Sequence, residues 1–194
     1  LLALKFSKLG AKITVADINT KGLEEKKELI KKNGGFGSYV FTRKLDVSDR
    51  SMITEVVNEA KNKFGDIDIL INNAGVFQGK AFTESNEKFT NKVLTINTEA
   101  HMWLIRDVLD PMIKRNSGQI VSINSIAGLA GNPGMVDYCA SKFAAYGLNE
   151  ALRLEMKSLG HKIKFTTICP FAFNSGMFKG VQCSLLYPLL EMED

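Results

Sequence analysis

The stretch Asp68-Ile-Leu-Ile-Asn-Asn-Ala-Gly75 decides the fold. Its first four residues are typical of a short buried strand, and the last four are typical of the turn that ends one. Outward from it, apolar β-branched runs at 12–17 and 119–123 repeat the strand pattern, with segments of helical periodicity between them. Strands and helices therefore alternate, which predicts right-handed βαβ crossovers and a mainly parallel sheet with helices on both faces.

The same patterns place the other elements. Gly10 and Gly160 each follow a helical pattern and are expected to end a helix, and Ser48 or Asp49 is expected to cap one. Pro111 lies late in a long helical pattern and is expected to bend or loosen its final turn. The expected helices are 1–9, 21–32, 49–64, 87–114 and 138–159, the strands are 12–17, 39–47, 68–71, 119–123 and 162–168, and 175–194 is helix-like. Because composition does not shift along the chain, residues 1–194 are expected to form a single domain.

Composition excludes several classes of protein. The 194 residues are 45% apolar and 24% charged, as in ordinary globular domains. The net charge of +4 is spread among acidic residues, so a nucleic-acid partner is not expected. No run of about 18 apolar residues is present, which argues against a membrane span. The three cysteines have no metal-binding spacing, which favours a reducing compartment and no metal site.

The first residues, Leu1 to Phe6, do not have the charge pattern of a signal peptide, and the chain lacks an initial Met. The expectation is that the chain begins in mid-structure.

Polar residues follow several of the expected strands. Asp17 ends one strand, Asp46 lies near the end of the next, and Ser125 follows a third. The turn 72–75 follows another strand, and Tyr138 begins the helix after Ser125. Because ligands of parallel sheets bind at the carboxyl ends of the strands, these residues predict a binding site along one rim.

Tyr138 and Lys142 stand four residues apart, on one face of a helix. A phenol is a poor base at neutral pH, but a nearby cation favours the phenolate and lowers the phenol pKa. Such a pair can take a proton from an alcohol or give one to a ketone, and Ser125 can hydrogen-bond the same oxygen. For the isolated pair, an exposed Tyr packed on a Lys side chain is the alternative; the joint pattern with Ser125 and the turn 72–75 favours catalysis.

Asn72-Asn-Ala-Gly75, Ser125 and Tyr138-x-x-x-Lys142 resemble the signature set of the short-chain dehydrogenases/reductases, in the same order and spacing. The resemblance covers nearly the whole chain. It implies a three-layer, Rossmann-type, doubly wound α/β fold, with Tyr138 as catalytic acid/base and Ser125 orienting the substrate oxygen. It further implies that Lys142 lowers the tyrosine pKa and binds the nicotinamide ribose, and that Asn97 supports a water relay to the lysine.

The resemblance also implies a nicotinamide cofactor. Asp17 matches the acid that binds the adenosine ribose hydroxyls, and Ile18 and Asn19 offer no cation for a 2′-phosphate, so NAD is preferred to NADP. A capping or turn role for Asp17 is the alternative. The remaining expected cofactor contacts are Asp46, Val47, Asn73, Ala74, Gly75, Tyr138, Lys142, Pro170 and Ser175.

Within the family, Cys169-Pro-Phe171 and Ser175-Gly-Met-Phe178 resemble a branch of membrane-associated retinol and 17β-hydroxysteroid dehydrogenases. The implied substrate is a lipophilic alcohol or carbonyl, with all-trans-retinol first and a steroid as the alternative. Apolar Phe171, Phe173, Met177 and Phe178 suit such a substrate but equally suit ordinary packing. The branch implies the endoplasmic reticulum membrane or lipid droplets, on the cytosolic face; the cytoplasm is the fallback, and a homodimer is an implied partner.

The chain departs from the family at its start. The glycine loop that holds the pyrophosphate is expected to be missing, together with the strand before it, which in the family lies between the strands that end at Asp17 and Ile71. Phe171 and Ser175 replace the usual Gly and Thr. A catalytically inactive remnant or isoform that does not bind cofactor is therefore the alternative to an active dehydrogenase.

Overall fold

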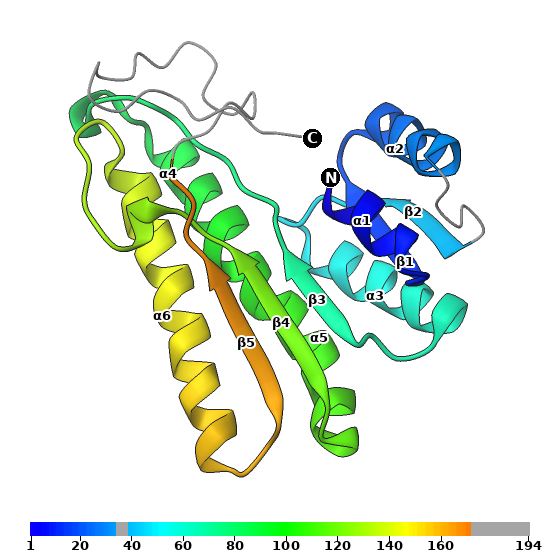
Figure 1. The fold of residues 1–194 in the computed structure, drawn as a ribbon. Coiled ribbons are helices and arrows are strands. Elements are labelled where there is room, and N and C mark those ends of the chain that lie inside the picture. Colours follow the sequence, from blue (N-terminus) through cyan, green and yellow to red (C-terminus); the bar gives the residue numbers. More distant parts are fainter. Residues whose placement is uncertain (34–38, 172–194) are drawn as a thin grey trace. The chain divides into compact units, whose positions relative to one another are not determined.

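The computed structural model describes residues 1–33 and 39–171 of the chain (Figure 1). These residues form two compact units, divided between Ile67 and Asp68. Each unit is described by itself below.

The first unit is a two-stranded parallel sheet with three helices. Strands β1 and β2 pair in register from Ile13 with Val40 to Asp17 with Lys44. Asn19 caps α2 by accepting from the Gly22 N–H, and Asp49 caps α3 by accepting from two backbone N–H groups. The elements are α1 (Leu2–Lys8), β1 (Ile13–Asp17), α2 (Thr20–Lys32), β2 (Val40–Lys44) and α3 (Arg50–Phe64).

The second unit contains a three-stranded parallel sheet in the order β3-β4-β5. Figure 1 shows its three strands side by side with the long helices α5 and α6 beside them. The elements are β3 (Ile69–Asn72), η2 (Phe82–Glu84), α4 (Glu87–Leu94), η3 (Thr95–Glu99), α5 (Ala100–Arg115), β4 (Gly118–Ile123), η4 (Ile126–Gly128), α6 (Val136–Ser158) and β5 (Ile163–Ile168).

One face of β4 is buried and the other is half-buried. Ile120 and Ser122 are fully buried, whereas Val121 and Ile123 between them are partly exposed, as expected for a strand covered mainly on one side. The Ser122 hydroxyl donates to Asn149 Oδ1 of α6 at 3.1 Å, so α6 covers the buried face. This hydrogen bond therefore holds the middle of α6 against β4.

The parallel strands and intervening helices confirm the α/β prediction, and most element bounds agree within about three residues. Gly10 and Gly160 follow α1 and α6 with φ of +82° and +77°, as predicted for helix-ending glycines. In the described residues β1 and β3 belong to different sheets.

The prediction of a single helix at 87–114 was wrong in the middle of that range. A π-helical turn, Thr95–Glu99, separates α4 from α5. Nothing local in the sequence marks it, since no Gly or Pro lies there. Pro111, expected to bend or loosen the final turn, lies inside α5, which continues to Arg115 before Asn116 adopts a left-handed conformation. The helix-like segment expected at 175–194 lies outside the described residues.

In the described parts of the chain, no helix is both long enough and apolar enough to cross a bilayer.

Candidate active site

Ser125 is held at the carboxyl end of β4. The backbone N–H of Asn124 donates to the Ile168 carbonyl at 2.8 Å, and that of Ile126 donates to the Pro170 carbonyl at 3.0 Å. Between these two bonds, the Ser125 hydroxyl oxygen accepts from the Ala127 N–H at 3.1 Å and caps η4. The serine therefore occupies a fixed place where β4 and β5 both end.

Tyr138 and Lys142 lie in the first two turns of α6, and their side chains lie close to each other. Both side chains are buried, with 5% and 3% of their surface exposed. The Lys142 ammonium lies 5.5 Å from the Tyr138 ring centroid and donates to the Ile123 carbonyl at 3.3 Å. The Ser125 hydroxyl lies close enough to the Tyr138 phenol to influence its pKa. The structure thus brings together the three residues that the sequence singled out.

Burial controls the ionisation of this cluster. It raises the pKa of Tyr138, and the nearby Ser125 hydroxyl only partly opposes the rise. Burial also lowers the pKa of Lys142 from 10.5 to about 8, against an opposing influence of Cys169. The lowered tyrosine pKa expected from the sequence is therefore not found in the chain alone, because loss of water around the phenol outweighs its neighbours.

The arrangement is suited to proton transfer. A buried phenol within hydrogen-bonding reach of a serine hydroxyl can exchange a proton with an oxygen placed between them. Close by, Lys142 has a pKa of about 8, so its charge changes near physiological pH. A cation beside a phenol stabilises the phenolate that forms when the proton leaves.

Asn97 lies in the π-helical turn and is fully buried. Its Oδ1 accepts from the Val76 N–H at 2.8 Å, and its Nδ2 donates to the Val76 carbonyl and to Ser141 Oγ, both at 3.0 Å. Both amide protons are therefore engaged. The side chain joins the segment after Gly75 to α6, and a π-helical turn at such a point is typical of functional sites.

Comparison with known proteins decides the family. The family model for short chain dehydrogenases matches residues 1–184. The chain belongs to the short-chain dehydrogenase family. Human epidermal retinol dehydrogenase 2 is 39% identical over 194 residues, which cover 98% of this chain and 62% of the relative. Mouse 17-beta-hydroxysteroid dehydrogenase 13 is 34% identical over 195 residues, which cover all of this chain and 63% of the relative.

Solved structures agree with this assignment. A short-chain dehydrogenase/reductase from Burkholderia phymatum, in complex with NAD, has a TM-score of 0.83 and 25% identity, covering 95% of this chain and 69% of that chain. ElxO with NADP bound has a TM-score of 0.82 and 27% identity, covering 93% and 71%. These matches confirm the Rossmann-type fold. The chain spans about three-fifths of the length of the curated relatives quoted above.

The short-chain dehydrogenase signature turn, 72–75, has a buried start and an exposed middle. Asn72 is 2% exposed, whereas Asn73 and Ala74 are exposed and Gly75 is half-buried. Pro170 is also half-buried, and its carbonyl is the acceptor for Ile126. The exposed positions of the turn are open to a ligand. Of the apolar residues expected to suit a lipophilic substrate, Phe171 is 39% exposed. The described residues do not include Phe173, Ser175, Met177 and Phe178.

Three further expected contacts lie in the first unit. Asp17 is exposed at the end of β1, and its Oδ1 accepts from the Asn19 N–H at 2.9 Å. Asp46 is exposed and accepts from the backbone and hydroxyl of Ser48; Val47 is half-buried beside it. Asp17 therefore lies at the end of a strand, as predicted, and its carboxylate also accepts the local hydrogen bond of a turn, which was the alternative role.

Lys44 is a cation in register with Asp17 that the local sequence did not indicate. It pairs in register with Asp17 across β1 and β2, so the two side chains emerge on the same side of the sheet. The expectation of no cation near Asp17 considered only the residues that follow Asp17 in sequence. The pairing of β1 with β2 places Lys44 in register with Asp17, and such pairing cannot be read from a short stretch of sequence.

His101 is a buried residue that the sequence did not single out. It lies four residues after Asn97 and is 1% exposed, with no hydrogen-bond partner for either ring nitrogen. Burial, followed by the charge of Lys142, lowers the pKa of His101 from 6.5 to about 4, and a weak interaction with the Ala74 backbone opposes this. The helical spacing from Asn97 is the signal that would have drawn attention to it.

Among residues 1–33 and 39–171, no group of three or more His, Cys, Asp or Glu side chains is arranged to hold a metal ion.

Proposed function

We propose that this short-chain dehydrogenase transfers a hydride between NAD and a lipophilic alcohol or carbonyl, with all-trans-retinol and retinal as the first pair. The observation that carries the proposal is the cluster of Ser125, Tyr138 and Lys142, two of them almost completely buried, at the carboxyl end of β4. Relatives named as retinol dehydrogenases support the substrate class.

In this proposal Tyr138 is the acid/base. Its phenolate takes the proton of the alcohol during oxidation, and its phenol gives a proton to the carbonyl oxygen during reduction. Ser125, whose hydroxyl lies near the tyrosine phenol, orients the substrate oxygen. Lys142 stabilises the phenolate that forms and binds the nicotinamide ribose. Because the Asn97 side-chain protons are already engaged, a water relay through Asn97 would use its backbone carbonyl.

The donor sets fit a nicotinamide dinucleotide. Asp17 has an exposed carboxylate with one oxygen free of the Asn19 contact, which suits ribose hydroxyls. The exposed backbone at Asn73 and Ala74 suits close approach of a ligand, and Asp46, Val47, Gly75, Pro170 and Ser175 complete the proposed contacts. The bound dinucleotide supplies the hydride chemistry, so the protein needs no nucleophile or metal of its own.

NAD is proposed over NADP because a carboxylate at Asp17 repels a 2′-phosphate. Lys44 lies beside it and works in the opposite direction. Comparison of kcat/KM for the two dinucleotides tests this balance. NAD should be favoured in the wild type, and Asp17→Ser, which leaves Lys44 unopposed, should shift the ratio toward NADP. A wild type that prefers NADP would refute the assignment.

The substrate class is tested by initial rates in the natural protein that carries this chain. All-trans-retinol, a 17β-hydroxysteroid and ethanol are compared at saturating NAD. Retinol should be oxidised with the highest kcat/KM. Preference for the steroid would select the second substrate, since 17-beta-hydroxysteroid dehydrogenases are also among the relatives. Preference for ethanol would refute a lipophilic site. A location at the endoplasmic reticulum or lipid droplets, and a homodimer, stay predictions.

The second candidate function is that of a catalytically inactive homologue acting through binding alone. It is favoured by one observation: the described strands form two separate sheets. Calorimetric titration of the purified 194-residue chain with NAD separates the candidates. Micromolar affinity would favour the active enzyme, and weak or undetectable binding would favour the inactive homologue.

A further inference from the structure

The Asp137 carboxylate accepts hydrogen bonds from two hydroxyl groups of a different segment. Ser85 Oγ donates to Asp137 Oδ2 at 2.6 Å, and Thr90 Oγ1 donates to the same oxygen at 2.7 Å. The two hydroxyl oxygens are themselves 3.3 Å apart. These three half-buried side chains are called the latch below. Hydrogen bonds to an ionised acceptor are stronger than neutral ones, so the latch is a firm connection.

The latch joins the starts of two helices. Asp137 is the second residue of α6, a helix whose N-cap, Met135, makes no side-chain capping bond. A carboxylate in the first turn is also favoured by the helix dipole. On the other side, Ser85 follows η2 and Thr90 lies in the first half of α4. The residue directly after Asp137 is Tyr138, so the latch is one peptide bond away from the proposed acid/base.

The segment 77–86 makes two more contacts with the start of α6. The Phe77 ring meets the Tyr138 ring edge-on, with centroids 5.2 Å apart and planes at 80°. The Lys80 N–H donates to the Gly134 carbonyl at 3.1 Å, in the turn before the helix. The segment therefore holds the turn before α6, Asp137 and Tyr138 at three successive points.

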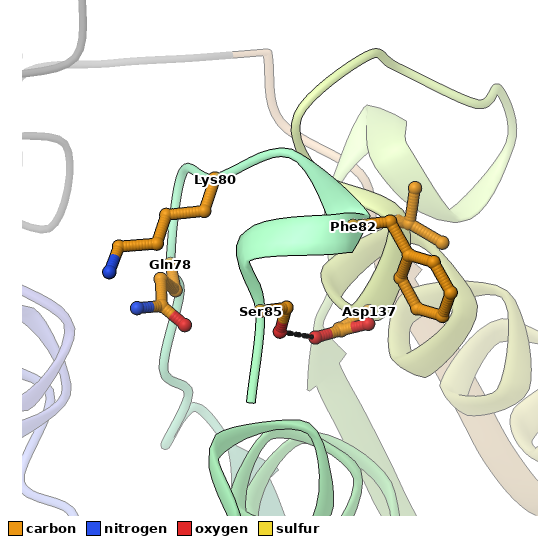
Figure 2. A pocket seen from close by; sticks show the side chains of 6 residues that line it. Gln78, Lys80, Phe82, Ser85 and Asp137 are labelled. Atoms are coloured by element: carbon orange, nitrogen blue, oxygen red, sulfur yellow. Dashed lines mark hydrogen bonds between the residues drawn. The ribbon is translucent and has the colours of Figure 1, made fainter. Parts of the chain in front are cut away.

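A small pocket lies between the segment and the helix. Figure 2 shows the Ser85 hydroxyl pointing at the Asp137 carboxylate inside it, while the Lys80 side chain extends away from that carboxylate. Phe82 and Val136 also line the pocket and are 61% and 46% exposed. Because Val136 and Asp137 directly precede Tyr138, the segment forms a wall beside the tyrosine.

We propose that Asp137 is a positioning residue for Tyr138, acting through the latch to fix the segment 77–86 against the first turn of α6. This inference rests on the proposed function, in which Tyr138 exchanges the proton. When the latch opens, the Phe77 ring loses its support and the tyrosine hydroxyl samples other orientations. The chemical step slows, whereas binding of NAD is unaffected.

The matched pair Thr90→Val and Thr90→Ser tests the latch without a change of charge. Valine keeps the shape of threonine but lacks the hydroxyl; serine keeps the hydroxyl and lacks the methyl. Amide hydrogen exchange at 77–86 and in the first turn of α6 should quicken about tenfold in Thr90→Val, the factor that corresponds to one lost hydrogen bond to a charged group. Thr90→Ser and the exposed control Asp110→Asn should exchange as the wild type does. Equal exchange in Thr90→Val and the wild type would overturn the latch.

Activity in the natural protein supplies the second arm. Thr90→Val and Asp137→Asn should each lower kcat for the preferred alcohol about tenfold, with the dissociation constant for NAD unchanged. The double variant should have the same kcat as Asp137→Asn alone, because both substitutions break the same connection, the latch. Loss by Thr90→Ser equal to that by Thr90→Val, or weakened NAD binding, would overturn the positioning role. A wild type that oxidises no alcohol would refute the proposed function, while the exchange comparison still decides the latch.

Discussion

Replacement of Lys142 by methionine should destroy activity and yet stabilise the fold. Lys142 is 3% exposed, and burial lowers its pKa from 10.5 to about 8. At about 1.36 kcal/mol per pKa unit, the folded state at pH 7 bears a cost of about 3 kcal/mol for holding this ammonium. Methionine fills similar space without charge, but leaves the Ile123 carbonyl without the 3.3 Å bond, at about 1 kcal/mol. The net gain is about 2 kcal/mol.

The pH dependence has a definite sign. Between pH 8 and 10.5 the unfolded chain holds the Lys142 proton while the folded chain has lost it. Wild-type stability should therefore rise with pH in that window relative to Lys142→Met, and the difference between the two proteins should shrink as the pH increases. A lysine that is needed for chemistry but costs stability is the usual trade-off at an active site.

Urea denaturation at pH 7, 8, 9 and 10 measures both effects. The control is Lys157→Met, at an exposed position of the same helix, which should change stability by less than about 0.5 kcal/mol. The reasoning is wrong if Lys142→Met is less stable than the wild type at pH 7, or if the difference between them does not change from pH 8 to pH 10.

Two other variants, His101→Phe and Gly128→Ala, test the buried surroundings of the site, and Gly147→Ala is their comparison. His101 has a pKa of about 4 in the folded state and 6.5 in the unfolded chain, so the free energy of unfolding should fall by about 3 kcal/mol as the pH drops from 6.5 to 4. In His101→Phe this loss should be absent. Equal acid sensitivity of the two proteins in urea titrations would contradict the burial of a neutral imidazole. A Cβ at Gly128 would lie 2.8 Å from the Lys142 carbonyl oxygen and 2.9 Å from Asn124 Nδ2, so Gly128→Ala should cost about 1–3 kcal/mol. Gly147→Ala, in open space within α6, should instead stabilise by about 0.5–1 kcal/mol; similar melting temperatures for the two alanine variants would refute the close approach at Gly128.

Local patterns in the sequence predicted the features that depend on neighbouring residues, such as helix caps and helix ends. Asp49 caps α3 and Gly160 follows α6 because hydrogen bonding and positive φ at those points depend on neighbours in sequence. The cluster of Ser125, Tyr138 and Lys142 was predictable for a related reason. Helical spacing fixes two of its members, and the end of a strand fixes the third.

Features that depend on packing between distant segments were not predictable. The latch joins residues separated by 52 and 47 positions, and Lys44 lies in register with Asp17 only because β1 and β2 pair. The π-helical turn at Asn97 interrupts a continuous helical pattern, and the buried amide there reaches both Val76 and Ser141. The raised pKa of Tyr138 likewise follows from burial in three dimensions, whereas the sequence showed only the nearby cation.

Oxidation of all-trans-retinol by Tyr138→Phe, in the natural protein that carries this chain, tests the central claim most directly. Phenylalanine removes the proton-exchanging hydroxyl and keeps the ring that packs on Phe77. Turnover should fall about 10²–10⁴-fold with NAD affinity nearly unchanged. Turnover close to that of the wild type would contradict the assignment of Tyr138 as the acid/base.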